Sequence, residues 1–250
     1  MQKELLDHIH FVLVGTTHPG NIGATARALK TMGLRRLELV ATRVFPSAEA
    51  TARASGADDV LAAAGRHESL DQALAGCGLV LATSGRSRNI DWPVYAPEEA
   101  MDLVLRQAAE GTHIAIVFGR ESSGLSNTEL DLCHGMIRIP ANPEFKSLNL
   151  AAAAQILSYE LRRQYLSGAP AEPLPEDRVP PADVAHMDRF YVELQACLAE
   201  IGYFDPEQPR LLMRRLKRLF NRSRMDLNEY NIMMGIIRAA RKAAGKKNES

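Results

Sequence analysis

The chain has few cysteines, and no two of them lie close together. Only three occur in 250 residues, at Cys77, Cys133 and Cys197. An odd number of widely spaced cysteines argues against a disulfide framework and against a cysteine-based zinc site. We therefore expect reduced thiols and a cytoplasmic protein.

The sequence also lacks long apolar runs, the pattern of a signal peptide and a net charge. No apolar run approaches the roughly 20 residues of a membrane span, and residues 1–15 lack the pattern of a signal peptide. Basic and acidic residues number 30 each, so the formal net charge is zero. We expect no membrane partner, and the net charge alone selects no class of ligand.

Common phosphate-binding and metal-binding patterns are also absent. The run FGRESSGLS at 118–126 follows a predicted strand but lacks the GK[ST] of a Walker loop, and no dinucleotide GxGxxG occurs. His8 and His10 share one face of a predicted strand, without a third ligand nearby in sequence. The sequence therefore predicts no metal site.

Apolar periodicity predicts strands that alternate with helices. The expected strands are 9–15, 35–40, 79–84, 113–119 and 135–140, and the main helices are 21–33, 97–110 and 147–166, with two short helices within 46–76. This order predicts an α/β domain at 1–167, with a mostly parallel sheet covered on both faces. Five prolines in 168–181 indicate a linker. Residues 182–250 form a predicted all-helical extension, with helices near 182–201, 208–222 and 226–243.

Three distant segments each join a predicted strand to a helix through a polar loop, at 21–34, 114–130 and 137–151. Because binding groups concentrate on loops held by a rigid scaffold, we expect one composite site. Asn21 and Ser147 are predicted helix N-caps, and Glu121 is expected to accept from a hydroxyl or to pair with Arg120 or Arg27. The small residues that precede Arg27 leave room for it along its helix, although a plain surface arginine fits its spacing equally well. The polar candidates are Asn21, Arg27, Glu121, Ser147 and Asn149.

Positive charge is concentrated in one stretch near the end of the chain. Residues 1–168 carry 16 basic and 18 acidic residues, whereas 169–250 carry 14 and 12. The run RLLMRRLKRLFNRSR at 210–224 has seven basic residues and no acidic one. Such a block favours a polyanionic partner over a merely solvated face. We expect phosphate contacts from one face of this helix, with two more near 83–88: Arg210, Arg214, Lys217 and Arg218, then Arg86 and Arg88.

These motifs, taken in order along the chain, resemble the SPOUT superfamily of knotted methyltransferases. The similarity is greatest to the TrmH/TrmJ group of tRNA ribose 2′-O-methyltransferases, and it covers nearly the whole sequence. Each motif is weak alone, but their order and spacing make the resemblance specific. They are NIGATARALKTMGL, ATSGRSR, VFGRESSGLSNTEL, IPANPEFKSLNLA and the helical tail.

The resemblance implies a C-terminal trefoil knot in the α/β domain and S-adenosylmethionine held by three loops, with no metal. It also implies a homodimer, in which the catalytic arginine Arg27 reaches the site of the neighbouring subunit. The family's polar site residues fall on the five candidates above. The cofactor residues fall on Thr83, Ser84, Gly85, Gly119, Ile139, Lys146, Ser147 and Leu148.

The implied reaction is methyl transfer to the ribose 2′-oxygen at position 32 of the tRNA anticodon loop. Arginine is effectively always protonated, so we prefer that Arg27 binds phosphate or the developing alkoxide rather than acting as a literal base. Two other functions remain open at this point. One is a SPOUT methyltransferase that acts on rRNA, and the other is a non-catalytic RNA-binding protein.

Overall fold

The computed structural model describes residues 5–84, 92–145, 147–168, 179–207 and 211–247. The chain divides into two compact units, Met1–Leu174 and Pro175–Ser250, each described separately below. Gly85, Arg86, Arg88, Lys146 and Arg210 lie outside the described residues, so the roles expected of them stay predictions.

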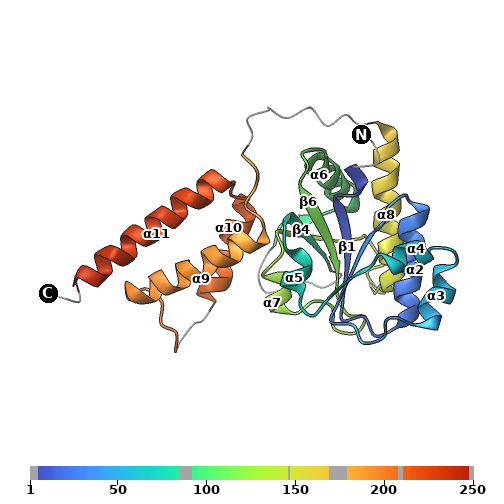
Figure 1. The fold of residues 1–250 in the computed structure, drawn as a ribbon, viewed down its shortest axis with the longest axis horizontal. Helices are drawn as coiled ribbons and strands as arrows, with labels where there is room; N and C mark the ends of the chain where they lie inside the picture. Colours follow the sequence, from blue (N-terminus) through green and yellow to red (C-terminus); the bar gives the residue numbers. More distant parts are fainter. Residues whose placement is uncertain (1–4, 85–91, 146, 169–178, 208–210, 248–250) are drawn as a thin grey trace. The chain divides into compact units, whose positions relative to one another are not determined.

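The first unit is built on a seven-stranded sheet with the order β3-β2-β1-β6-β4-β7-β5 (Figure 1). Every described strand pair is parallel, which confirms the predicted α/β class with a mostly parallel sheet. The strands are β1 (Ile9–Val14), β2 (Arg36–Val40), β3 (Gly65–His67), β4 (Cys77–Thr83), β5 (Val94–Tyr95), β6 (His113–Phe118) and β7 (Gly135–Ile137).

Helices lie on both sides of this sheet. In Figure 1, α2, α3 and α8 lie on one side, and α5 and α7 lie on the other. Parallel strands buried on both faces read as continuous apolar runs, as HFVLV and IAIVF do here. The helices are α2 (Pro19–Thr31), α3 (Ala48–Ala54), α4 (Asp58–Ala62), α5 (Leu70–Leu74), α6 (Pro97–Ala109), α7 (Asn127–Leu130) and α8 (Leu150–Ser167).

The main core lies between the sheet and the layer of α2, α6 and α8. Phe11 of β1 stacks on Phe118 of β6 with ring centroids 5.6 Å apart, and both side chains are buried. Ile22 and Leu29 of α2 and Leu157 of α8 belong to the same core cluster and are fully buried. This core fixes α2 and α8 against the sheet.

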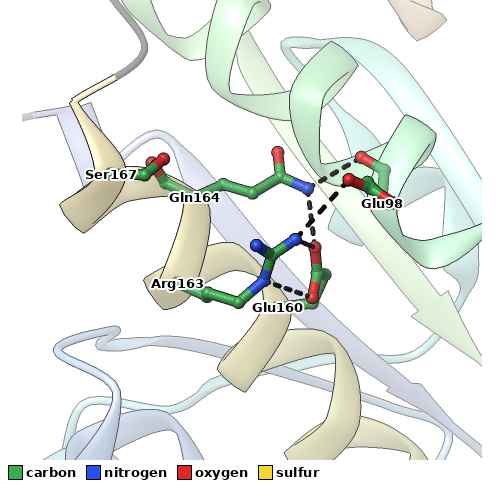
Figure 2. A network of polar contacts seen from close by, with 5 residues as sticks. All are labelled: Glu98, Glu160, Arg163, Gln164 and Ser167. Carbon is green, nitrogen blue, oxygen red and sulfur yellow. Dashed lines mark hydrogen bonds and ion pairs between the residues drawn. The ribbon is translucent and has the colours of Figure 1, made fainter.

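A polar network also fastens α8 to the start of α6 (Figure 2). Gln164 donates from Nε2 to the carbonyl oxygen of Glu98 at 2.9 Å and to Oε1 of Glu160 at 2.8 Å. Arg163 donates to both carboxylate oxygens of Glu160, at 3.0 and 2.7 Å. The bond to a backbone oxygen fixes the position of α8 along α6 more firmly than exposed ion pairs alone would.

The second unit consists of α9 (Val184–Glu200), α10 (Leu212–Ser223) and α11 (Leu227–Lys247). Phe190 of α9 is fully buried in its core, beside Met234 and Ile237 of α11. Arg241 of α11 donates to Glu193 and Glu200 of α9. The extension is helical as predicted, and no helix in the described residues is long and apolar enough to span a membrane.

Two predicted helix starts are wrong. Helix α2 begins at Pro19, so Asn21 lies inside its first turn and is buried rather than capping it. Proline is well suited to the first helical position, because its missing N–H has no partner there. Helix α8 begins after Asn149, whose Oδ1 accepts from the N–H groups of Ala151 and Ala152. Ser147 therefore lies before the helix and does not cap it.

The segment 46–76 is also more complex than predicted. It holds three short helices and the edge strand β3, where two helices were expected, and the two-residue strand β5 was not predicted at all. Both strands are at the edges of the sheet, where neither face gives a long apolar run. The trefoil knot implied by the resemblance stays a prediction.

Gly23 permits the close packing of α2 on α3. A Cβ at this position would collide with the backbone carbonyl oxygen of Ala50, which cannot move without shifting α3. Close packing of α2 on α3 therefore requires a glycine at this position.

We predict that Gly23→Ala lowers the free energy of unfolding by about 1–3 kcal/mol, the usual cost of overpacking. Gly20→Ala in the same helix is the matched control, because its Cβ would press only on the end of the flexible Glu49 side chain and would make an ordinary contact with Arg53. Urea unfolding followed by circular dichroism measures both. Equal stability of the two variants would contradict the packing role of Gly23.

Candidate functional site

A cavity of about 780 Å³ opens at the carboxyl ends of the central strands, hereafter the site pocket. Its walls come from the residues that follow β4, β6 and β7 and from the start of α8. Ligand sites in open parallel sheets occur at this edge. Phe118, Leu130 and Ile137 form an apolar part of the wall, while polar side chains line the rest. A mixed wall of this size suits a nucleoside-sized ligand.

Most of the predicted site residues line this one pocket, although they come from four distant segments. Of the polar candidates, Asn21, Glu121, Ser147 and Asn149 are in the wall. Of the predicted cofactor residues, the described ones are all in the wall: Thr83, Ser84, Gly119, Ile139, Ser147 and Leu148.

A continuous chain of hydrogen bonds joins three of the candidates. Asn21 donates from Nδ2 to Oε1 of Glu121 at 2.9 Å. Asn149 donates from Nδ2 to Oδ1 of Asn21 at 3.0 Å, while its own Oδ1 caps α8. Asn21 is 8% exposed, so leaving either of its amide atoms unpaired would carry a desolvation cost. Asn21 therefore fixes the loop after β6 and the start of α8 relative to α2.

Glu121 is held as an ionised hydrogen-bond acceptor. Partial burial acts to raise the pKa of its carboxyl, but hydrogen bonds from Asn21 and from backbone N–H groups outweigh burial and lower the pKa. Thr17 donates to Oε2 from both its backbone N–H and its hydroxyl, each at 3.3 Å. A carboxylate with a lowered pKa is a poor general base. We assign Glu121 a positioning role.

Arg120 does not pair with Glu121, as the sequence suggested, but with Glu129. Its guanidinium donates to both carboxylate oxygens of Glu129, at 3.0 and 2.9 Å. Glu129 also accepts from the N–H of Ser126 at 2.6 Å, while Ser126 caps α7 in return. This reciprocal capping box has a visible pattern, Ser-x-x-Glu, which the sequence reasoning missed.

The loop 119–125 folds tightly back on itself. Arg120 and Gly124 exchange two backbone hydrogen bonds, of 3.2 and 2.9 Å. A Cβ on Gly119 would collide with the backbone of Gly124 and Leu125. Gly119 therefore permits this close approach, in a loop that forms one side of the pocket.

The ends of β4 and β7 are joined beneath the pocket. Thr83 donates from Oγ1 to the carbonyl oxygen of Val117 at 3.1 Å. The N–H of Ser84 donates to the carbonyl oxygen of Ile137 at 3.2 Å. Together these bonds hold three strand ends in register, so the pocket floor is part of the sheet.

Arg27 is the one described polar candidate that does not line the pocket. It lies on α2 beyond Asn21, and its side chain is exposed. Within the described residues, no carboxylate is paired with its guanidinium. The arrangement leaves Arg27 accessible to another molecule or subunit.

The predicted basic stripe on α10 is partly packed against its own unit. Arg210 is outside the described residues, and the other members are half-buried: Arg214, Lys217 and Arg218. The Lys217 ammonium lies 5.4 Å from the ring centroid of Tyr191. The exposed basic residues of α10 are Arg222, which was expected to continue the stripe, and Arg215, which was not part of it.

The histidines near the start of β1 form part of a ladder across the sheet. His10 contacts Oε1 of Glu38 at 3.1 Å and Nδ1 of His113 at 3.1 Å, and His67 contacts Oε2 of Glu38 at 2.8 Å. In the described part of the chain, no group of three or more His, Cys, Asp or Glu is arranged to hold a metal ion. Trp92 is 4% exposed, so its ring packs inside the fold and is not a platform for stacking a base.

Known families match both units of the chain. Residues 8–159 match the SpoU rRNA Methylase family, and residues 185–249 match the C-terminal domain of the tRNA methyltransferase TrmJ. The chain is 44% identical over 248 residues to the tRNA (cytidine/uridine/adenosine-2′-O-)-methyltransferase TrmJ of Pseudomonas aeruginosa (strain UCBPP-PA14), with 96% of each sequence covered.

Solved structures agree with these matches. The crystal structure of TrmJ from Z. mobilis ZM4 is similar with a TM-score of 0.80 and 32% identity, covering 92% of this chain and 97% of that one. An AdoMet-bound rRNA methyltransferase from Sinorhizobium meliloti is similar with a TM-score of 0.50 and 25% identity, covering 62% of this chain and 56% of that one. The second similarity spans less of the chain than the first.

We predict that the contribution of Glu129 to stability depends on pH. Burial acts to raise its pKa, but the hydrogen bonds from Arg120 and Ser126 lower the pKa in the folded state. A lowered folded pKa stabilises the protein above the unfolded value, about 4.3, and this contribution is lost as the pH falls. Glu129→Gln should cost about 2 kcal/mol at pH 7, and the difference from wild type should shrink below about pH 4.

Urea unfolding at pH 7, 5 and 3.5 measures this difference. Glu68→Gln is the control, because Glu68 is exposed. A cost of Glu129→Gln that stays constant across the three pH values would show that the ionised clamp with Arg120 does not stabilise the loop.

Proposed function

The chain belongs to the SpoU methylase family, and we propose that it transfers the methyl group of S-adenosylmethionine to a ribose 2′-oxygen of tRNA. The observation that carries this proposal is the match of both units at once. The first unit matches the methylase family, and the second matches the C-terminal domain of TrmJ. The relative from Pseudomonas aeruginosa, a tRNA 2′-O-methyltransferase by name, spans nearly the whole chain.

The site pocket fits S-adenosylmethionine in size and in chemistry. Its volume of about 780 Å³ exceeds that of a nucleoside, and Ile137, Ile139 and Leu148 offer an apolar surface for the adenine ring. Glu144 and Ser147 in the same wall offer polar groups for the rest of the cofactor. The sulfonium supplies an already activated methyl group, so the protein must mainly position the 2′-oxygen and help to remove one proton.

We assign to Arg27 the role of contacting the ribose and phosphate of the RNA substrate. Because its guanidinium stays protonated, it is suited to bind the adjacent phosphate or to stabilise the developing alkoxide. Asn21, Glu121 and Asn149 hold the pocket in shape through their hydrogen bonds. Ser147, in the pocket wall before α8, is assigned to the cofactor side with Thr83 and Leu148.

The protein is proposed to act as a homodimer in the cytoplasm. Several apolar residues of α8 and of the segment that precedes it are exposed. The exposed fractions are 75% for Phe145, 55% for Tyr159 and 65% for Leu166. A helix otherwise buried against the core would gain stability by covering these side chains with a second copy. In such a dimer, the exposed Arg27 of one subunit reaches the pocket of the other.

The target nucleotide is proposed to be position 32 of the anticodon loop. Single-stranded loops present riboses and bases that a protein can reach, unlike the grooves of an RNA helix. The helical unit, with Arg214, Lys217 and Arg218 on α10, is proposed to bind the tRNA backbone. An rRNA substrate is less well supported, since the AdoMet-bound rRNA methyltransferase covers only 62% of this chain.

The first test is mass-spectrometric mapping of ribose methylation. Purified tRNA and rRNA are incubated separately with the protein and S-adenosylmethionine, with and without EDTA. We predict one 2′-O-methylated nucleotide at position 32 in tRNA, none in rRNA, and no effect of EDTA. Methylation confined to rRNA would overturn the assigned substrate, and binding of tRNA without any methylation would favour a non-catalytic protein.

The second test asks whether Arg27 acts across subunits. Arg27→Ala should abolish methylation and leave the affinity for S-adenosylmethionine within a few-fold of wild type, as measured by calorimetry. Asn149→Ala should reduce both, because it breaks the hydrogen-bond chain. Arg106→Ala, which removes another exposed helical arginine, is the matched control and should keep full activity.

Mixing Arg27→Ala, which is expected to be inactive, with Asn149→Ala, which is expected to be impaired, tests the dimer itself. After subunit exchange, a mixed dimer would contain one intact site if Arg27 serves the neighbouring subunit, so about a quarter of wild-type activity should return. If Arg27 serves its own subunit, every site in the mixture stays defective. No recovery, or a monomeric mass by light scattering in the active protein, would contradict the dimer.

A further inference from the structure

A second cavity, of about 680 Å³, lies beside the far end of α8. It is formed by the end of α2, the residue before β2, the start of α4 and the last turns of α8. It shares no lining residue with the site pocket. We call it the basic cavity, after the charged residues that line it: Lys30, Arg35, Arg162 and Asp59.

The charges in the basic cavity do not cancel. Lys30 donates to Oδ1 of Asp59 at 2.8 Å and to the carbonyl oxygen of Gly56 at 2.9 Å, so its charge is matched within the cavity. Arg35 and Arg162 have no carboxylate partner among the residues that the structure describes. Two guanidinium groups therefore provide an excess of positive charge, in a unit whose overall charge is slightly negative.

Arg162 is held in place rather than extended into solvent. Its guanidinium carbon lies 5.5 Å from the ring centroid of Tyr165, a distance at which the cation and the ring attract each other. It also lies close against Gly33, where an added Cβ would come within 3.2 Å of Nη1. Gly33 has a φ of +82°, so it is a glycine for conformational reasons and at the same time leaves room for the arginine. A fixed guanidinium fork loses little freedom when it binds a phosphate.

The distance between the basic cavity and the site pocket suits a long ligand. Asn149 caps α8 at the site pocket, and Arg162 lies thirteen residues further along the same helix. At a rise of about 1.5 Å per residue, the two ends are about 20 Å apart. A folded tRNA is larger than this separation, so nucleotides of one molecule can reach both places.

We propose that the basic cavity binds the phosphodiester backbone of the tRNA substrate, a few nucleotides away from the reacting ribose. This inference rests on the proposed function, and it adds Arg35 and Arg162 to the residues that recognise RNA. Phosphate is favoured as the ligand because arginine forks bind its oxygens in pairs. It also implies that the first unit contributes to RNA binding and does not only hold the cofactor.

The test compares the full-length wild-type protein with the double variant R35Q/R162Q. Binding of a tRNA transcript is measured by fluorescence anisotropy at several salt concentrations. Loss of two phosphate contacts should lower the log–log salt slope by about 1.4 and weaken binding roughly tenfold near 0.15 M salt. Affinity for S-adenosylmethionine and the mass by light scattering should not change.

Two further variants separate a specific site from a general charge effect. R66Q/R106Q removes the same charge from exposed arginines that line neither cavity, and it should shift the slope far less. R35K/R162K keeps the charge but loses the guanidinium forks, so it should keep most of the salt slope with weaker binding.

Each outcome decides something. If wild type methylates tRNA while R35Q/R162Q binds tRNA with an unchanged slope, the basic cavity is not an RNA site, although the proposed function stands. If the variant changes only the oligomeric mass, the cavity is a subunit contact and the inference is wrong. If wild type does not methylate tRNA at all, it is the proposed function that fails. If R66Q/R106Q and R35Q/R162Q lose tRNA affinity and salt slope equally, the effect comes from net charge alone, and the inference is also overturned.

Discussion

The hydrogen bonds of one buried asparagine hold the site together. Asn21 donates to Glu121 and accepts from Asn149, which lie 100 and 128 residues further along the chain. Because the side chain is almost fully buried, both its donor and its acceptor need partners. Glu121 brings the loop after β6, and Asn149 brings the start of α8. The pocket wall therefore depends on α2 having the correct position on the sheet.

Two backbone constraints make that position rigid. Gly23 lets α2 approach α3 closely, and Gly119 lets the loop 119–125 fold back on itself. The clamp between Arg120 and Glu129 then ties this loop to α7. Methyl transfer needs the donor and the 2′-oxygen in line, so a preformed pocket favours the reaction by reducing what must be ordered at each turnover. The exposed Arg27 is outside this rigid set, in keeping with its proposed role towards RNA and a second subunit.

The strands and the long helices could be predicted from the sequence, since apolar runs and 3.6-residue periodicity report local structure directly. The segments of the site were also found, because loops after buried strands carried polar residues without a packing role. The roles of single residues within these segments were harder to predict. Asn21 and Ser147 resembled N-caps by residue type, yet Pro19 begins α2 earlier and Asn149 caps α8 instead. The pairing of Arg120 with Glu129 and the basic cavity depend on contacts between distant segments, which periodicity does not contain.

The most direct measurement is a double-mutant cycle between Glu121 and Asn149, in which calorimetry gives the free energy of S-adenosylmethionine binding. The two side chains are joined only through Asn21 in the described hydrogen bonds. If Asn21 transmits their effects, Glu121→Gln and Asn149→Ala should be non-additive by about 1 kcal/mol, and this coupling should vanish when the cycle is repeated with Asn21→Ala. Additive effects in the wild-type background would contradict a site held together by Asn21.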